Sequence, residues 1–316
     1  MTEKFQKMGL QCVSTETGKP VPMPEQTVLC LGNFDGVHRG HQALLKRAEE
    51  LCKTSFPGAT CGVFCFRELS SDYLFERSPE HLTTFSEKLN LFARYGAKIA
   101  VIGDFQTLRT LTPEAFAKEV LLQACGCRAV VCGFNYRFGK GAVGTAKTLE
   151  AMLDRPVFVC DPVEENGEAV SSTKIRTAVK EGRIRDVEVM LGRPYEISGT
   201  VEHGKELGRK LGFPTANLGF PEHSVIPKFG VYATECEIGG KRYRGVSNVG
   251  MRPTVEPSAK RANCETYLIG YDGDLYGQSL RIRFLELIRP EKKFASVDEL
   301  REQIRNDAET AKTFGE

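Results

Sequence analysis

Two histidines three residues apart, His38 and His41, are the residues whose type and spacing point most directly to chemistry. They lie in a glycine-containing turn that follows an apolar run at residues 28–31 and precedes a helix-like stretch at residues 42–51. Backbone N–H groups at the start of a helix attract phosphate, and imidazole donors there can stabilise charge on a phosphate under attack. We therefore predict a phosphate-binding turn. The alternative is a pair of half-buried loop histidines.

A second candidate segment, residues 133–144, follows a predicted strand. It interleaves aromatic residues with Asn135, Arg137 and Lys140, which could stack on a planar ring and contact its phosphates. A surface loop with a buried phenylalanine explains the same pattern equally well.

A third candidate segment begins a predicted helix with the hydroxyls of Ser171, Ser172 and Thr173. Such hydroxyls are most often helix caps. Arg176 lies on the same first turn, however, and its planar guanidinium suits phosphate. Together with the histidine turn, this segment would form a phosphate clamp.

The elements that must position these residues alternate in the first part of the chain. Strands are predicted at residues 28–31, 60–66, 99–102, 128–132 and 157–160, and helices at 42–51, 86–92, 113–123, 145–153, 173–180 and 184–190. This alternation indicates a doubly wound parallel sheet covered by helices, in which ligands bind beyond the carboxyl ends of the strands. The histidine turn lies at such an end.

The second part of the chain is β-rich. Strands are predicted at residues 199–203, 232–238, 242–249, 264–269 and 279–287, and a Ser296–Glu299 capping box starts one closing helix. Consecutive strands without intervening helices indicate an antiparallel β-barrel or sandwich. The fold class is therefore α/β plus β, and we divide the chain into domains at residues 1–188 and 189–316.

Composition indicates which kind of ligand the protein binds and in which cellular compartment it is found. The 43 basic and 41 acidic residues leave a net charge of +2, which favours small anionic ligands over nucleic acid. The 11 cysteines contain no CxxC pair and are interpreted as reduced thiols, which indicates a cytoplasmic protein. No signal peptide is recognisable, and no apolar run reaches the roughly 18 residues of a membrane span. The oligomeric state is left open.

At this point the motifs resemble a known family. The sequence Gly-Asn-Phe-Asp-Gly-Val-His-Arg-Gly-His at residues 32–41, with Ser-Ser-Thr-x-Ile-Arg at 171–176, is similar to the nucleotidyltransferase superfamily and closer still to the bifunctional bacterial riboflavin kinase/FAD synthetases. The second half carries further motifs in the family's order: Pro-Thr-Ala-Asn at 214–217, Gly-Val-Tyr at 230–232, Asn-Val-Gly-Met-Arg-Pro-Thr at 248–254, Glu-Thr-Tyr-Leu at 265–268 and Asp-Leu-Tyr-Gly at 274–277. The resemblance covers nearly the whole chain.

For the N-terminal domain, a nucleotidyltransferase, the resemblance implies transfer of AMP from ATP to FMN, giving FAD and pyrophosphate. His38, His41 and Arg176 would then be catalytic. The implied nucleotide contacts are Gly32, Asn33, Phe34, Asp35, Gly36, Asn135, Ser171, Ser172 and Thr173.

For the C-terminal domain, the resemblance implies phosphorylation of riboflavin to FMN by ATP. Glu265 would be the base that takes the proton of the alcohol, although out of context it would be interpreted as a solvated strand carboxylate. Thr215 and Asn217 would hold Mg²⁺, which prefers oxygen ligands. The implied nucleotide contacts are Gly204, Gly208, Arg209, Gly212, Pro214, Thr215 and Asn217.

The chain departs from the family after the second predicted strand. Members commonly carry Phe-Asp/Glu-Pro-His-Pro, whereas this chain has Phe-Arg-Glu-Leu-Ser at residues 66–70. Two alternatives to the bifunctional enzyme therefore stay open: a riboflavin kinase with a weakened or differently specific N-terminal transferase, and a non-catalytic flavin-binding regulatory protein. Transfer of FMN between the two sites and feedback by flavins are also left open.

Overall fold

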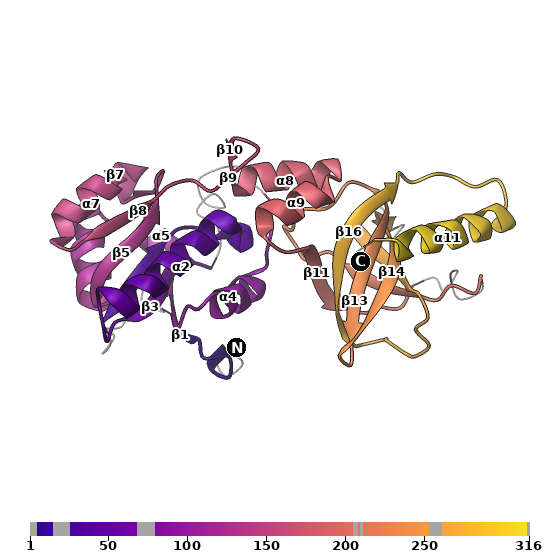
Figure 1. Ribbon diagram of the computed structural model, residues 1–316, viewed down its shortest axis with the longest axis horizontal. Coiled ribbons are helices and arrows are strands. Elements are labelled where there is room, and N and C mark those ends of the chain that lie inside the picture. The colour runs from indigo at the N-terminus through magenta and orange to yellow at the C-terminus, as the bar shows by residue number, and fades with distance from the viewer. Residues whose placement is uncertain are drawn as a thin grey trace. The chain divides into compact units, whose positions relative to one another are not determined.

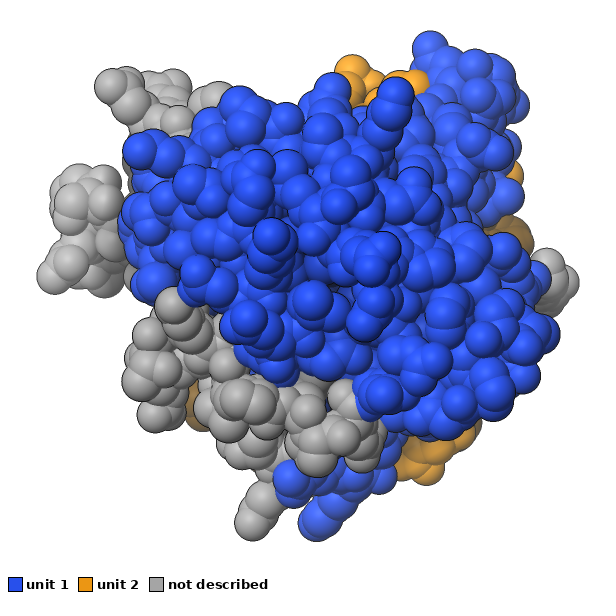
Figure 2. Space-filling view, turned by 90° about the vertical axis from the view of Figure 1, so that its left-hand side faces the viewer, with its two compact units in different colours: residues 1–172 blue, residues 173–316 orange. Residues whose placement is uncertain are grey.

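The computed structural model describes residues 5–14, 26–67, 80–204, 208, 211–252 and 261–314. The chain splits into two compact units, Met1–Ser172 and Thr173–Glu316 (Figures 1 and 2). Most of α8 (Ser172–Glu181) and all of α9 (Ile184–Leu191) belong to the second unit. The division at residue 188 falls inside α9 and stays a prediction.

The first unit is built on a six-stranded parallel sheet with the strand order β1-β4-β3-β2-β5-β8. Its strands are β1 (Gln11–Ser14), β2 (Thr27–Leu31), β3 (Thr60–Phe66), β4 (Ile99–Gly103), β5 (Cys127–Gly133) and β8 (Val157–Cys160). All five strands predicted for this part are present, and β1 is an edge strand that the sequence pattern did not indicate.

Helices cover both faces of this sheet (Figure 1). The helical elements are α2 (Arg39–Thr54), α4 (Phe85–Arg94), α5 (Phe105–Leu108), α6 (Pro113–Ala115), the π-helix η2 (Phe116–Ala124) and α7 (Ala146–Leu153). Because successive strand residues point to opposite faces, Val28 packs in the cluster of α2 and α4, whereas Leu29 packs in that of η2 and α7. The doubly wound fold is therefore confirmed.

The strand order places the histidine turn at a particular point of the sheet. β2 is central, with β3, β4 and β1 on one side and β5 and β8 on the other. The chain order therefore reverses beside β2, which makes its carboxyl end the topological switch point where ligands bind in such sheets. The turn that begins at Gly32 leaves β2 at this point.

The second unit is an antiparallel six-stranded sheet with the order β11-β16-β13-β14-β15-β12. Its strands are β11 (Tyr195–Thr200), β12 (Thr215–Gly219), β13 (Gly230–Ile238), β14 (Lys241–Arg252), β15 (Arg261–Leu268) and β16 (Ser279–Arg289). A bridge between Glu202 and Asn217 joins the chain just after β11 to β12 and curls the sheet into the predicted barrel.

Two strand predictions in the barrel need correction. The strand predicted at residues 199–203 begins earlier, because Tyr195 and Ile197 already alternate into the core. β12 was missed, since its short sequence Thr-Ala-Asn-Leu-Gly combines residues that are common in turns.

The closing helix α11 (Val297–Lys312) packs on β13 and β14 through Ala308 and Ala311. Ser296 caps it, accepting a hydrogen bond from the N–H of Glu299 at 3.1 Å. Asp307 is 2% exposed and accepts hydrogen bonds from Arg289 of β16, with Nη2–Oδ2 at 2.8 Å and Nε–Oδ1 at 3.0 Å. This bidentate pair ties the helix to the barrel.

Replacing Asp307 with alanine should destabilise the second unit by about 3 kcal/mol, because Arg289 would be left in a largely buried position without its partner. Thermal or denaturant unfolding of the chain measures this effect. Asp298→Ala is the matched control, since Asp298 pairs with Arg301 in the same helix while 89% exposed. Its cost should stay below about 1 kcal/mol. Equal losses in the two variants would contradict the assigned role.

Candidate active sites

The turn after β2 is shaped by a residue in the left-handed backbone region. Phe34 has φ 54° and is fully buried, with its ring between His41, at 5.1 Å between centroids, and Phe92, at 5.3 Å. The Phe34 ring also packs against Gly32, because a Cβ at position 32 would lie only 3.3 Å from a carbon of that ring. Gly36 follows with φ 76°, a value that favours glycine. Packing of the Phe34 ring between two other rings therefore stabilises the turn.

Asp35 and Gly36 join the turn by hydrogen bonds to the segment at residues 82–83. The buried Asp35 carboxylate accepts hydrogen bonds from the N–H of Leu82 at 3.0 and 3.2 Å, and the N–H of Gly36 donates to Thr83 Oγ1 at 3.2 Å. Ser172 Oγ donates to the carbonyl of Asp35 at 2.9 Å. The structure thus brings one predicted hydroxyl to the histidine turn, and it gives the Asp35 carboxylate a structural role there.

The two histidines stack on each other. Their ring centroids are 3.7 Å apart and their planes differ by 21°. His38 is the N-cap residue of α2, and Gly40 leaves room for its ring, because a Cβ at that position would lie 3.1 Å from His38 Cε1. His41 Nδ1 is buried and has no hydrogen-bond partner among the described residues. Both imidazoles therefore lie at the start of a 16-residue helix, where the helix dipole is positive.

Burial lowers the pKa of His41 well below its ordinary value of 6.5, and electrostatic interactions with His38 and Lys88 lower this pKa further. His41 is consequently a neutral imidazole at pH 7. A neutral imidazole still donates one N–H, so it can stabilise a developing charge without carrying one itself.

Lys88 is a residue of this site that the sequence analysis missed. It lies in α4, is 3% exposed, and donates from Nζ to the carbonyls of Phe66 at 3.3 Å and Asn33 at 3.4 Å. A cation is thereby buried at the carboxyl ends of β2 and β3. The available signal was its spacing four residues before Phe92, which places a lysine on the apolar face of the helix.

The other predicted residues of the first site are more dispersed. Asn135 is exposed in a tight turn after β5, and the following Tyr136 stacks on the buried Phe138 at 6.0 Å between centroids. Thr173 and Arg176 belong to the second unit, so their approach to the histidines stays a prediction. Of the altered segment at residues 66–70, only the first two residues lie within the described ranges.

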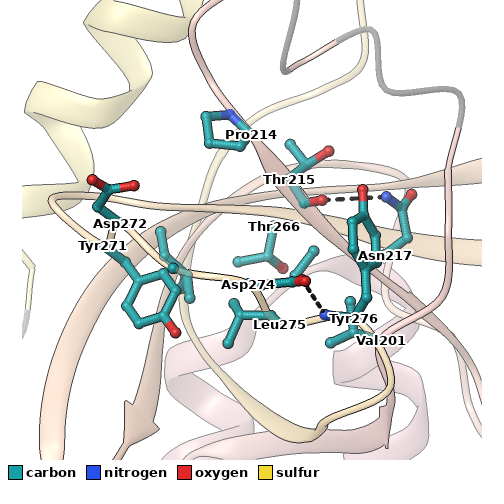
Figure 3. Close-up of a pocket in the computed structure, with 13 residues that line it drawn as sticks. Val201, Pro214, Thr215, Asn217, Thr266, Tyr271, Asp272, Asp274, Leu275 and Tyr276 are labelled. Carbon is teal, nitrogen blue, oxygen red and sulfur yellow. Dashed lines mark hydrogen bonds between the residues drawn. The ribbon is translucent and has the colours of Figure 1, made fainter.

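The second unit contains a cavity of about 420 Å³ beside β12 and the chain that joins β15 to β16 (Figure 3). Its walls combine apolar and polar groups: Val201, Pro214, Thr215, Ala216, Asn217, Thr266, Leu268, Tyr271, Asp272, Gly273, Asp274, Leu275 and Tyr276. Tyr276 also stacks on His203, with 3.9 Å between centroids. The size of the cavity and its mixture of apolar and polar walls are typical of a small-molecule site.

The predicted metal ligands lie at the edge of this cavity. Asn217 is buried, and its Nδ2 donates to the carbonyl of Thr215 at 3.4 Å (Figure 3). The chain after β11 passes directly over it, since a Cβ on Gly204 would lie 2.6 Å from Asn217 Nδ2. A Cβ on Gly208 would likewise clash with the carbonyl oxygen of Phe213, and Gly212 has φ 86°. Arg209 lies outside the described residues.

Glu265 projects from β15 and is exposed. It pairs directly with Asn217 across the β12–β15 ladder, but it is not part of the cavity wall. The structure therefore brings Thr215, Asn217 and Glu265 to one part of the barrel, with the cavity alongside. The wall residues Tyr271 and Asp272 were missed, because they lie in a connection whose path the sequence pattern does not define.

Within the ranges that the structure describes, no three histidine, cysteine or carboxylate side chains gather closely enough to hold a metal ion. None of the helices in those ranges combines the length and the apolar character that a membrane crossing requires.

Comparison with known proteins agrees with this division into two sites. A riboflavin kinase family model matches residues 191–314, and an FAD synthetase family model matches residues 21–174. The chain is 37% identical over 297 residues to the bifunctional riboflavin kinase/FMN adenylyltransferase of Escherichia coli K12, covering 92% of this chain and 93% of that protein. It is 34% identical to the Bacillus subtilis protein of the same description, covering 90% and 92%.

Among solved structures, the crystal structure of a macrolide-efflux protein from Streptococcus pneumoniae is similar to this chain with a TM-score of 0.88. The two are 30% identical, and the match covers 96% of this chain and 99% of that one. Both family models fall in the order that the sequence motifs predicted. The chain therefore belongs to the bifunctional riboflavin kinase/FMN adenylyltransferase family.

Proposed function

We propose that the chain carries out two successive reactions with ATP. The second unit phosphorylates riboflavin to FMN, and the first unit adenylates FMN to FAD with release of pyrophosphate. This proposal depends on one observation: each unit has its own group of candidate catalytic residues. The first unit has a stacked histidine pair at the switch point of the parallel sheet. The second unit has a Thr215–Asn217–Glu265 group beside the barrel cavity.

In the first unit, a phosphate oxygen of FMN attacks the α-phosphorus of ATP, and the bond to the β-phosphate oxygen breaks. The nucleophile is already an anion, so this reaction needs charge stabilisation and positioning more than a base. His38, His41 and the N–H groups at the start of α2 supply donors, and Lys88 supplies a buried positive charge. Arg176, Asn135 and the hydroxyls at 171–173 complete the proposed nucleotide site.

In the second unit, the nucleophile is a primary hydroxyl of riboflavin. Glu265 accepts its proton as the oxygen bonds to the γ-phosphorus of ATP and ADP leaves. Thr215 and Asn217 fit Mg²⁺, because they offer a hydroxyl and an amide oxygen two residues apart on one strand, and this ion keeps most of its other positions for water and phosphate. When bound, the ion neutralises charge on the phosphates of ATP.

The eleven cysteines are all free thiols. Burial raises the pKa of several of them, to about 12 for Cys61 and Cys125. Such thiols are unreactive, which fits the cytoplasmic location that we propose. The proposed partners are small molecules alone: riboflavin, FMN and ATP.

The direct test is to incubate the purified chain with riboflavin, ATP and Mg²⁺ and to separate the flavins over time. FMN should appear first and FAD after it. FMN without FAD would show that the first unit is weakened or specific for another substrate, and the absence of both products would support a flavin-binding protein instead.

His41→Ala should lower the rate of FAD formation from supplied FMN by about 10²–10³, because it removes a donor to the transferred phosphate. FMN formation from riboflavin should not change, since that reaction takes place in the other unit. Both rates are measured on the same preparation, which makes the kinase reaction the internal control. A parallel loss of the two activities would contradict separate sites.

Glu265→Gln should have the opposite effect and lower FMN formation by about 10²–10⁴, because the alcohol loses the group that takes its proton. Conversion of supplied FMN to FAD should continue at the wild-type rate. Glu237→Gln, at an exposed position on β13 of the same barrel, is the matched control and should retain both rates. Wild-type kinase activity in Glu265→Gln would remove Glu265 from the reaction.

The depressed pKa of His41 has a consequence for stability. A folded-state pKa below 6.5 means that the unfolded chain binds the proton more readily, so this contribution to stability is complete above pH 6.5 and is lost as the pH falls. His41→Gln cannot be protonated. Its first unit should therefore lose less stability than wild type between about pH 7.5 and pH 5.5, as measured by thermal unfolding at each pH. Identical losses would show that burial of neutral His41 is unimportant for stability.

A further inference from the structure

Three polar side chains lie together on one face of the barrel, on two neighbouring strands. Asn263 and Glu265 are two residues apart in β15, so they point to the same face. Asn217 of β12 is the direct partner of Glu265 across the antiparallel ladder. The intervening Cys264 is fully buried and points into the barrel, away from this group.

Asn263 lies between the other two. Its Nδ2 is 3.1 Å from Asn217 Oδ1 and 3.4 Å from Glu265 Oε1. An amide nitrogen carries two hydrogens, which is the number needed to donate to both oxygens. Asn263 is 4% exposed, whereas Glu265 is exposed. A buried group thus holds the carboxylate at the surface.

The orientation of each amide follows from its partners. Asn217 Nδ2 faces the carbonyl of Thr215, which can only accept, so Asn217 must turn its oxygen toward Asn263. Asn263 must then present its nitrogen. The result is one continuous series of hydrogen bonds from the backbone of Thr215 through Asn217 and Asn263 to Glu265.

The neighbouring strands leave space for this bridge. The residues paired with Asn263 are glycines on both sides, Gly219 in β12 and Gly250 in β14. No atom lies within 4 Å of the place where a Cβ on Gly219 would be, whereas the Glu291 carboxylate occupies the place of a Cβ on Gly250. The open side at Gly219 lets the Asn263 amide reach along the face toward both oxygens.

We infer that Asn263 is a positioning residue for the kinase reaction, which joins the magnesium ligand Asn217 to the base Glu265. This inference rests on the proposed function. One hydrogen of Asn263 orients the Asn217 oxygen, whose second lone pair stays available to the ion, and the other fixes the carboxylate. One buried amide thereby fixes the position of the Glu265 carboxylate relative to Asn217.

The test is the isosteric variant Asn263→Leu, assayed for FMN formation at varied riboflavin and Mg²⁺. Loss of a group that orients metal ligands typically costs about 10–100-fold. We expect a fall of this size in kcat and a rise in the Mg²⁺ concentration for half-maximal rate, and, without turnover, weaker binding of Mg²⁺ with ADP as measured by calorimetry. KM for riboflavin should change less than kcat, because Asn263 itself is not part of the cavity wall.

A double-mutant cycle separates positioning from general damage to the strand. In a Glu265→Ala background, Asn263→Leu should lower the remaining rate much less than it does in wild type, since the carboxylate it orients is absent. A purely structural role would give the same factor in both backgrounds and would overturn the inference. Asn263→Leu with wild-type kcat and Mg²⁺ dependence would overturn it as well.

Controls come from the same chain. Cys264→Ala changes the adjacent buried residue of β15 and should retain the wild-type kcat. FAD formation from supplied FMN should be normal in every variant. If Asn263→Leu fails to fold, the smaller Asn263→Ser decides, because serine avoids overpacking and is too short to reach both oxygens. A wild-type chain that makes no FMN would defeat the proposed function itself, whereas a normal kinase rate in these variants would defeat this inference alone.

Discussion

The first site depends on one backbone constraint, the left-handed conformation of Phe34 at the carboxyl end of β2. It turns the chain sharply enough for α2 to begin at Arg39, and it buries the Phe34 ring against His41. A non-glycine residue in this conformation costs about 1–3 kcal/mol unless its surroundings hold it. Here the surroundings do so, through the Asp35 carboxylate and the contact of the ring with Phe92. The stacked histidines and the helix N-terminus follow from this turn.

Much of the first unit could be predicted from periodicity, because its strands are continuous apolar runs and its helices are amphipathic. The pattern failed where a segment is short or polar, as in β1 and β12. It also treated residues 113–123 as one regular helix, whereas the chain continues from Phe116 as a π-helix, a distinction of hydrogen-bond register that apolar spacing does not encode.

The proposed catalytic residues and the residues that position them differ in how far sequence can identify them. His38, His41 and Glu265 stand in recognisable motifs. Lys88 and Asn263 do not, because their roles depend on burial and on cross-strand partners that only the folded chain brings together. A lysine in a helix is ordinarily exposed, and an asparagine in a strand is ordinarily unfavourable. Each is an exception to its local pattern, and such exceptions concentrate at functional sites.

The two units meet opposite electrostatic demands with one strategy. Adenylation begins from an anionic nucleophile, and the proposed first site accordingly combines hydrogen-bond donors with the buried cation of Lys88. Phosphorylation begins from a neutral alcohol, so we propose that the second site uses a carboxylate, which has to be held close to the ATP phosphates. Asn263 fits this requirement, since its amide donates to Glu265 and to Asn217 at once and keeps the carboxylate beside Asn217. In both sites, a buried polar group that need not touch the reacting atoms sets the geometry of those that do: Asp35 in the first unit and Asn263 in the second.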